Sequence, residues 1–158
     1  MLATLAPQRG IASDTFAPLI EIWRALVDNP AQLKEWYAER WQQTVRHGKA
    51  EAYAQIRPAY NARPNGADLL FLCRACYGGV VRFRKADGFM STPRGIHEPI
   101  SPAAFTKRVD EWHRRVAGVE VRLADYCEVM ADANAGDLVY CDPPYSYTQS
   151  ILYGAQSF

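Results

Sequence analysis

The stretch that decides the fold is "DLVYCDPPYSYTQ", which runs from Asp137 to Gln149. A short apolar run stops on an acid, and two prolines and an aromatic residue follow at once. An apolar run bounded by such turn residues is typical of a buried strand. We therefore predict a buried strand over residues 137–142, with the carboxylate of Asp142 at its carboxyl end.

The preceding segments alternate between strand and helix patterns. "VEVRLAD" (residues 119–125) has the period of a strand, and a short helix is predicted around "YCEVMADAN". This alternation predicts an α/β fold with a parallel sheet. Ligands of open α/β sheets bind at the carboxyl ends of the strands. Asp125 and Asp142 each fall at such an end, and Asp14 follows the short "GIAS", so three acids are expected on one rim.

The rest of the chain is predicted to be mainly helical. The first helix covers residues 15–28, with Ser13 or Asp14 as its cap, and the next covers residues 31–46. "EAYAQIRPAYNARPNG" (residues 51–66) is predicted to be a broken, polar connection, and a helix resumes over residues 68–77. The last long helix begins after the cap Ser101 and stops at Gly118.

The segment from residue 77 to residue 99 is the most basic part of the chain. Basic and aromatic residues alternate there, and Asp87 and Gly88 form a hairpin-turn pair, which predicts a loop or β-ribbon. The formal net charge of the 158 residues is only +1, so a nucleic-acid contact depends on this local cluster. Its cations are Arg82, Arg84, Lys85 and Arg94.

The tetrapeptide Asp142, Pro143, Pro144, Tyr145 suits chemistry on the exocyclic amine of a nucleobase. Two acceptors, the Asp142 carboxylate and the rigidly held Pro143 carbonyl, favour a pyramidal nitrogen whose lone pair attacks a methyl donor. Tyr145 is placed to stack on the base, worth about 1–3 kcal/mol, which is comparable with the cost of flipping a base out of a duplex. The alternative is a purely structural turn after the strand.

Several other classes of protein are not indicated. No apolar stretch approaches the ~18 residues of a membrane helix, and the N-terminus has no secretory signal, so we expect a cytoplasmic protein with reduced thiols. Cys73 and Cys76 form a lone C-x-x-C, which is either a redox pair, half of a zinc site or, as we favour, two thiols on a helix. The three histidines have no ligand spacing, and no metal is expected.

The chain resembles the Dam-type DNA adenine N6-methyltransferases, in the form common in phages and prophages. The segments that carry the resemblance are "GDLVYCDPPYSYTQSILYGAQSF", "FLCRACYGGVVRFRKADGFMSTPRG" and "VRLADYCEVM", which occur in family order and span most of the chain. The resemblance implies S-adenosylmethionine as the methyl donor and double-stranded DNA as the partner.

The resemblance also implies a role for each matching position. Asp142, Pro143, Pro144 and Tyr145 match the catalytic tetrapeptide and the adenine pocket. Asp125, followed by Tyr126, matches the acid that binds the adenine amine of the donor, and Asp14 matches the acid that holds the ribose hydroxyls. The matches to the DNA-recognition loop are Tyr77, Gly78 and Arg82, with Arg84, Lys85 and Arg94 beside them.

Two features depart from the family pattern. Gly78 stands where many members have asparagine, and the glycine-rich F-x-G-x-G loop of the donor site is absent. We therefore expect an incomplete Rossmann-like core, built from residues 1–57 and 115–158, around a mainly helical recognition insertion at residues 58–114. The unpaired edges of such a sheet predict self-association.

Two other functions remain open on the sequence. Methylation of cytosine N4 presents the same kind of amine, although an acid at the first position of the tetrapeptide argues against it. A non-catalytic DNA-binding remnant would keep the segment from Tyr77 to Arg94 and lack a donor site, as the missing glycine loop suggests.

Overall fold

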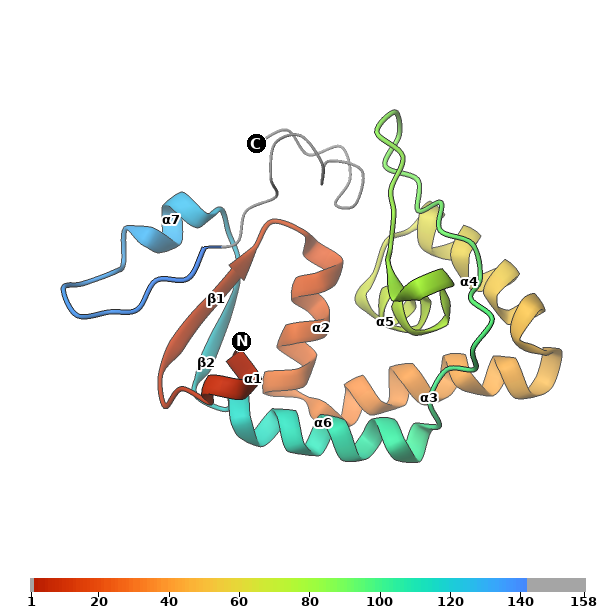
Figure 1. Ribbon diagram of the computed structural model, residues 1–158, viewed down its shortest axis with the longest axis horizontal. Helices are drawn as coiled ribbons and strands as arrows, with labels where there is room; N and C mark the ends of the chain where they lie inside the picture. The colour runs from red at the N-terminus through yellow and green to blue at the C-terminus, as the bar shows by residue number, and fades with distance from the viewer. Residues whose placement is uncertain (1, 142–158) are drawn as a thin grey trace.

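The computed structural model describes residues 2–141 of the chain. A small sheet lies at one end of the molecule and a group of helices lies at the other (Figure 1). The elements in chain order are α1 (Leu2–Leu5), β1 (Gly10–Asp14), α2 (Ala17–Asp28), α3 (Pro30–His47), α4 (Lys49–Ala62), α5 (Gly66–Ala75), the 3-10 turn η1 (Tyr77–Gly79), α6 (Pro102–Val116), β2 (Val119–Leu123) and α7 (Tyr126–Met130).

The sheet of the described residues has two strands, β1 and β2, which pair in parallel. Gly10 lies opposite Val119 and Asp14 lies opposite Leu123, so the two strands end at the same rim. Parallel neighbours need a long crossover connection, and here everything from α2 to α6 forms it. The described residues thus combine helices with a parallel sheet, which confirms the α/β class predicted from the sequence.

The two edges of the sheet differ. Gly10 N donates to Gly118 O, and Ala124 N donates to Asp14 O. Because the bonding residues alternate along a parallel strand, the backbone N–H and C=O groups of Ile11 and Ser13 face the outer edge of β1. On the outer edge of β2, the Arg24 Nε of α2 donates to Val121 O at 3.1 Å. An arginine side chain therefore covers part of one edge, and self-association through the sheet stays a prediction.

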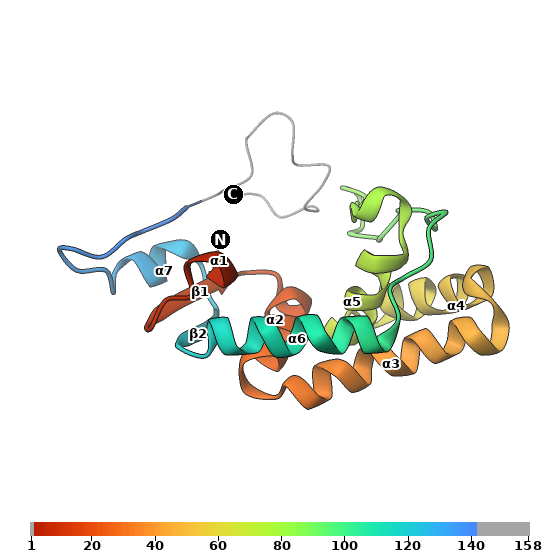
Figure 2. The ribbon, with the colours of Figure 1, turned by 60° about the horizontal axis from the view of Figure 1, so that its bottom comes forward.

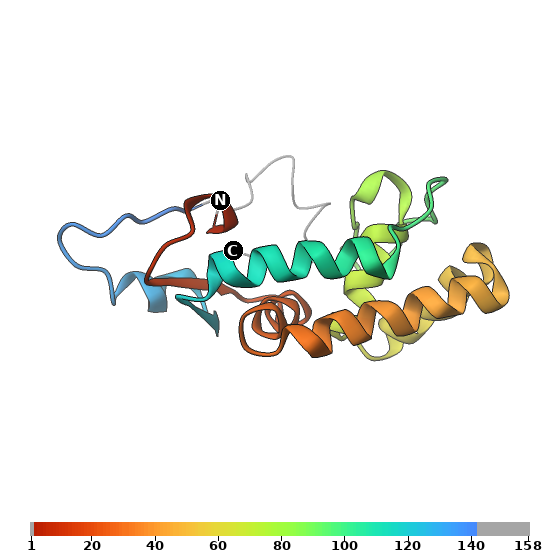
Figure 3. The same ribbon diagram turned by 90° about the horizontal axis from the view of Figure 1, so that it is seen from below.

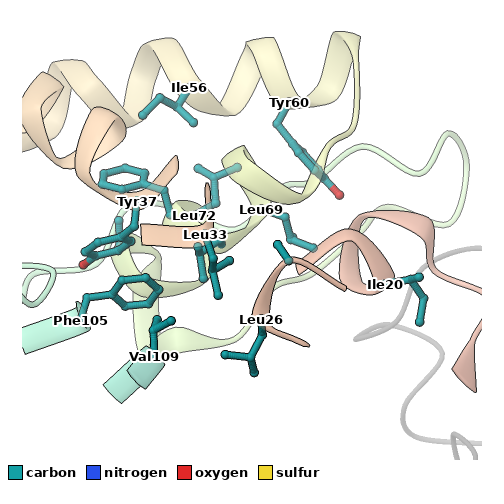
Figure 4. Packing of buried hydrophobic residues seen from close by; sticks show 14 of the residues in the cluster. Ile20, Leu26, Leu33, Tyr37, Ile56, Tyr60, Leu69, Leu72, Phe105 and Val109 are labelled. Atoms are coloured by element: carbon teal, nitrogen blue, oxygen red, sulfur yellow. The ribbon is translucent and has the colours of Figure 1, made fainter. Parts of the chain in front are cut away.

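The core lies between α2, α3, α4, α5 and α6. The rings of Tyr37 and Phe105 stack there with their centroids 4.1 Å apart, and Figure 4 shows them beside the leucines of α3 and α5. Seen from below, α6 runs alongside α2 and α3 (Figure 3), which it contacts. The turned view in Figure 2 shows α4 and α5 behind α3 and α6. Burial of these helix faces provides most of the stability, because short helices are marginal alone.

Most of the predicted helices are confirmed. α2, α3, α5, α6 and α7 fall where the apolar periodicity placed them, and β2 occupies the predicted strand. Asn65 caps α5 by accepting from Asp68 N at 2.8 Å, and Ser101 caps α6 by accepting from Ala104 N at 3.3 Å. Each such cap satisfies one of the free N–H groups at the start of a helix.

The prediction of a broken connection over residues 51–66 is wrong, because most of that segment belongs to α4. Pro58 lies inside this helix, where it costs about 3 kcal/mol. Four apolar side chains of α4 are buried, and the burial of each large one contributes about 1.5–3 kcal/mol. Their burial outweighs the proline; they are Ala52, Tyr53, Ile56 and Tyr60.

The prediction of a buried strand over residues 137–142 is also wrong for the part that the structure describes. Residues 137–141 form no strand, and Leu138 is 80% exposed. The segment instead follows a turn in which Asn134 N donates to Asp137 Oδ2 at 2.8 Å. A strand needs a neighbour for its backbone groups, and within residues 2–141 neither β1 nor β2 pairs with this run.

Two predicted helix signals act differently from expectation. Phe16 is the cap residue of α2, and Asp14 closes the turn before it by accepting from Phe16 N. α6 ends at the cap Ala117, and Gly118 serves a close approach, because a Cβ there would collide with the Gln8 carbonyl.

Candidate functional site

Two carboxylates occupy equivalent places at the rim of the sheet. Asp14 ends β1, and Asp125 follows β2 by two residues. Asp14 Oδ1 accepts from Phe16 N, and Asp125 Oδ1 accepts from Cys127 N, each at 2.8 Å. Within the described residues, the second oxygen of each carboxylate has no hydrogen bond. Both side chains are partly exposed.

Asp125 is also the cap of α7, and this places Tyr126 at the first helical position. Tyr126 is 55% exposed. A hydrogen bond with the Cys127 side chain, together with the charge of Asp125, raises the pKa of the Tyr126 phenol. Tyr126 therefore offers a neutral aromatic surface beside the rim.

Residues 76–95 form the predicted ribbon, which we call the basic ribbon. Its two sides are joined at Cys76 and Arg94 and again at Phe83 and Met90, both antiparallel. Gly88 forms the turn with φ of 67°. Such a value favours glycine, as the hairpin-turn pair in the sequence predicts. In Figure 1 the tip of the basic ribbon and the carboxyl end of β1 lie on the same side of the molecule.

Helix α4 holds the basic ribbon through three side chains. The Asn61 amide contacts both backbone groups of Met90: Oδ1 accepts from Met90 N at 2.6 Å, and Nδ2 donates to Met90 O at 3.2 Å. Tyr53 Oη donates to Thr92 O at 2.8 Å, and Arg57 Nη1 donates to the same oxygen at 3.2 Å. The Asn61 side chain thus acts as a short strand neighbour for the ribbon.

Thr92 links the two sides of the basic ribbon from within. Its side chain is fully buried, and Thr92 Oγ1 accepts from Arg82 N at 2.7 Å while it donates to Val80 O at 3.1 Å. Because Thr92 also accepts from α4 through its carbonyl, the backbone of Arg82 is fixed relative to that helix.

The outward side chains of the basic ribbon are mostly exposed. Tyr77 is 57% exposed, and Arg82, Lys85 and Arg94 are exposed as well. Arg84 is engaged at the tip: its Nε donates to Asp87 Oδ1 at 3.0 Å, and its guanidinium lies 4.3 Å from the centre of the Phe89 ring. The hydrogen bond from Arg84 lowers the pKa of Asp87.

The neighbouring cysteines do not form a reactive pair. Cys73 lies in the last turn of α5 and Cys76 caps it, and both are free thiols. Burial raises the pKa of Cys73 to about 12, which disfavours the thiolate that redox chemistry and metal binding require. Among residues 2–141 no three His, Cys, Asp or Glu side chains gather as a possible metal site.

Comparison with known proteins shows the family of this chain. The family model for D12 class N6 adenine-specific DNA methyltransferases matches residues 1–154. The chain belongs to this family.

The relatives that the chain matches come from bacteria, a phage and a retron. The chain is 24% identical to the type II methyltransferase M1.LlaDCHI of Lactococcus lactis, over 89% of this chain and 51% of that protein. It is 27% identical to the DNA N-6-adenine-methyltransferase of Escherichia phage P1, over 87% of this chain and 18% of that protein. It is 32% identical to the retron Ec67 DNA adenine methylase of Escherichia coli, over 63% of this chain and 36% of that protein. The chain thus spans about half the length of its first relatives, or less.

The structure brings together some of the predicted site residues of this chain. Asp14 and Asp125 share one rim, and the tip of the basic ribbon lies on the same side of the molecule (Figure 1). The predicted catalytic residues 142–145 lie outside the described residues. Sequence reasoning missed Asn61 and Thr92. Asn61 lies in the predicted connection and Thr92 in the ribbon segment, and neither position indicates by itself which backbone groups the side chain will bind. No helix within residues 2–141 is long and apolar enough to cross a membrane.

Proposed function

We propose that this chain acts as part of a DNA adenine N6-methyltransferase, which transfers a methyl group from S-adenosylmethionine to the exocyclic amine of a flipped adenine. The observation that carries the proposal is the pair of carboxylates at one rim of β1 and β2, on the side to which the basic ribbon points. Family membership supports the same reaction. The sheet would be the partial Rossmann-like core, and residues 58–114 would be the recognition insertion.

The rim fits the polar groups of the donor. Asp14 and Asp125 each keep one oxygen that accepts no hydrogen bond within the described residues, which suits ribose hydroxyls at Asp14 and an adenine amine at Asp125. A buried or partly buried carboxylate forms strong hydrogen bonds with such donors. S-adenosylmethionine would supply an activated methyl group. Tyr126 would cover the donor's adenine ring.

The catalytic residues would act on the acceptor amine. Asp142 and the carbonyl of Pro143 would accept hydrogen bonds from the two N–H groups of the amine, Pro144 would keep the backbone rigid, and Tyr145 would stack on the flipped base. Stacking and an ordered pocket offset the few kcal/mol that base flipping costs. No metal and no covalent enzyme intermediate are needed, because the amine itself attacks the methyl group.

The basic ribbon would contact DNA. Tyr77 would stack on bases beside Gly78, and Arg82 would reach a base edge, where a bidentate arginine provides about 1–3 kcal/mol of discrimination. Lys85 and Arg94 would meet phosphates, and Arg84 would do so only after it leaves Asp87. Each lost phosphate contact lowers the salt slope of duplex binding by about 1.

The first experiment is calorimetric titration of the chain with S-adenosylmethionine, with Asp125→Ala and Glu128→Ala in parallel. Glu128 is an exposed acid of α7, so its variant has the same change of charge outside the rim. We expect binding that is lost in Asp125→Ala and kept in Glu128→Ala. No binding by the folded wild-type chain would refute the catalytic proposal and favour the DNA-binding remnant.

A methylation assay on adenine-containing duplexes distinguishes methylation of adenine N6 from the alternative, methylation of cytosine N4. Transfer of a labelled methyl group to adenine supports the proposal, and transfer to cytosine would refute it. The matching family is adenine-specific, so we expect label on adenine alone and none with Asp142→Ala.

A further inference from the structure

One side-chain contact joins the rim of the sheet directly to the basic ribbon. The ring of Phe16 meets the ring of Phe83 edge to face, with centroids 5.5 Å apart and an angle of 77° between the planes. Phe16 precedes α2, and Phe83 lies in the basic ribbon between two arginines. The contact therefore joins two regions to which the proposed function gives different ligands.

Phe16 is held by the carboxylate that we assign to the donor. Its backbone N–H donates to Asp14 Oδ1 at 2.8 Å, so this bond ties the position of Phe16 to that of the Asp14 carboxylate. A ligand that binds the other oxygen of Asp14 therefore also acts on the position of the Phe16 ring.

Phe83 lies between the Phe16 ring, which it contacts, and the side chains proposed to contact DNA. It is partly buried, whereas Arg82 and Arg84 on either side of it are exposed. Phe83 faces Met90 across the ribbon, and Met90 is the residue that Asn61 holds. A shift of the Phe83 ring therefore shifts the backbone that carries Arg82.

Helix α2 also contacts both the support of the basic ribbon and the sheet. Glu21 Oε2 accepts from Gly66 N at 2.6 Å, at the start of α5, the helix that leads into the basic ribbon. Arg24 Nε donates to Val121 O in β2. α2 thus contacts the sheet, the support of the ribbon and, through Phe16, the ribbon itself.

We propose that Phe16 and Phe83 are positioning residues that couple the donor site to the basic ribbon, so that donor and DNA each raise the affinity for the other. The inference rests on the proposed function. A ligand at one site favours the arrangement of the turn, the two rings and the ribbon that the ligand at the other site also binds. An edge-to-face pair supports a coupling of about two- to tenfold. Linkage requires the same factor in both directions.

The test measures coupling rather than binding alone. Affinity for a fluorescein-labelled, adenine-containing duplex is measured by anisotropy, with and without saturating S-adenosylhomocysteine, the donor without its methyl group. Affinity for S-adenosylhomocysteine is measured by calorimetry, with and without duplex. For the wild-type chain we expect the two factors to agree and to lie at about two to tenfold.

Three single variants and one double variant locate the coupling. Phe83→Leu and Phe16→Leu keep an apolar side chain and remove the ring contact, and each is expected to reduce the factor to about one; the double variant is expected to do no more. Phe89→Leu is the matched control, because its ring packs under Arg84 at the tip, and it should keep the wild-type factor. Far-UV circular dichroism confirms folding, and the two variants on different elements guard against one that fails to fold.

The outcomes distinguish this inference from the proposed function. A wild-type chain that binds both ligands with a factor of one overturns the coupling and leaves the proposed function standing. Full coupling in both Phe83→Leu and Phe16→Leu overturns the role of the ring pair. A wild-type chain that binds neither ligand overturns the proposed function itself.

Discussion

The Asn61→Ala substitution tests whether α4 holds the basic ribbon. The change removes two hydrogen bonds to the backbone of Met90, whose side chain is fully buried. A buried polar group that loses its partner costs about 1–3 kcal/mol. The N–H and C=O of Met90 regain part of this by contact with water, so we expect the ribbon to open about 2 kcal/mol more easily.

Native-state hydrogen exchange measures this opening directly. A change of about 2 kcal/mol corresponds to exchange about 30-fold faster. The affected amides are those of Met90 and of Arg82, Arg84 and Ser91, which are bonded across the ribbon. Amides in the middle of α6 should exchange as in the wild-type chain, because that helix does not depend on the ribbon.

Gln55→Ala is the matched control on the same helix. Gln55 is exposed and donates to Glu51 Oε1 alone, one turn away. A surface pair of this kind contributes about 0.2–0.5 kcal/mol, so ribbon exchange should change by less than about threefold. The reasoning is refuted if Asn61→Ala leaves the ribbon amides within that range, because the two contacts to Met90 would then contribute nothing to its position.

Three further predictions concern the framework. Gly118→Ala should lower the free energy of unfolding by about 1–3 kcal/mol, measured by urea denaturation, because its methyl group collides with the backbone of Gln8; wild-type stability would contradict this. At pH 8, Cys73 should react with a maleimide far more slowly than the exposed Cys127, as mass spectrometry of timed aliquots would show, because burial raises the Cys73 pKa to about 12; equal rates would contradict this. Burial also raises the Tyr37 pKa to about 12. Since both groups lose protons more easily when unfolded, stability should be full below about pH 9 and should then fall by up to about 1.4 kcal/mol per pH unit for each group; a flat melting temperature up to pH 11 would refute this.

The sequence determined the local features that depend on near neighbours along the chain. The periodicity of α2, α3 and α6 was readable because each helix buries one face. The turn at Asp87 and Gly88 was readable because its backbone conformation favours glycine. The placement of Asp14 and Asp125 at strand ends followed from the same local patterns, and the pairing of β1 with β2 confirms it.

The tertiary structure decided what depends on distant partners. α4 was missed because Pro58 reads as a break, and only burial against α3 and α5 compensates for it. The apolar run over residues 137–142 predicts a strand, but such a run does not say whether a neighbour exists for its backbone, and residues 137–141 pair with neither β1 nor β2. The contacts of Asn61 with Met90 and of Phe16 with Phe83 join segments far apart in the chain. Such contacts leave no periodic trace in the sequence, because they depend on how the helices pack and not on the spacing of residues within one element.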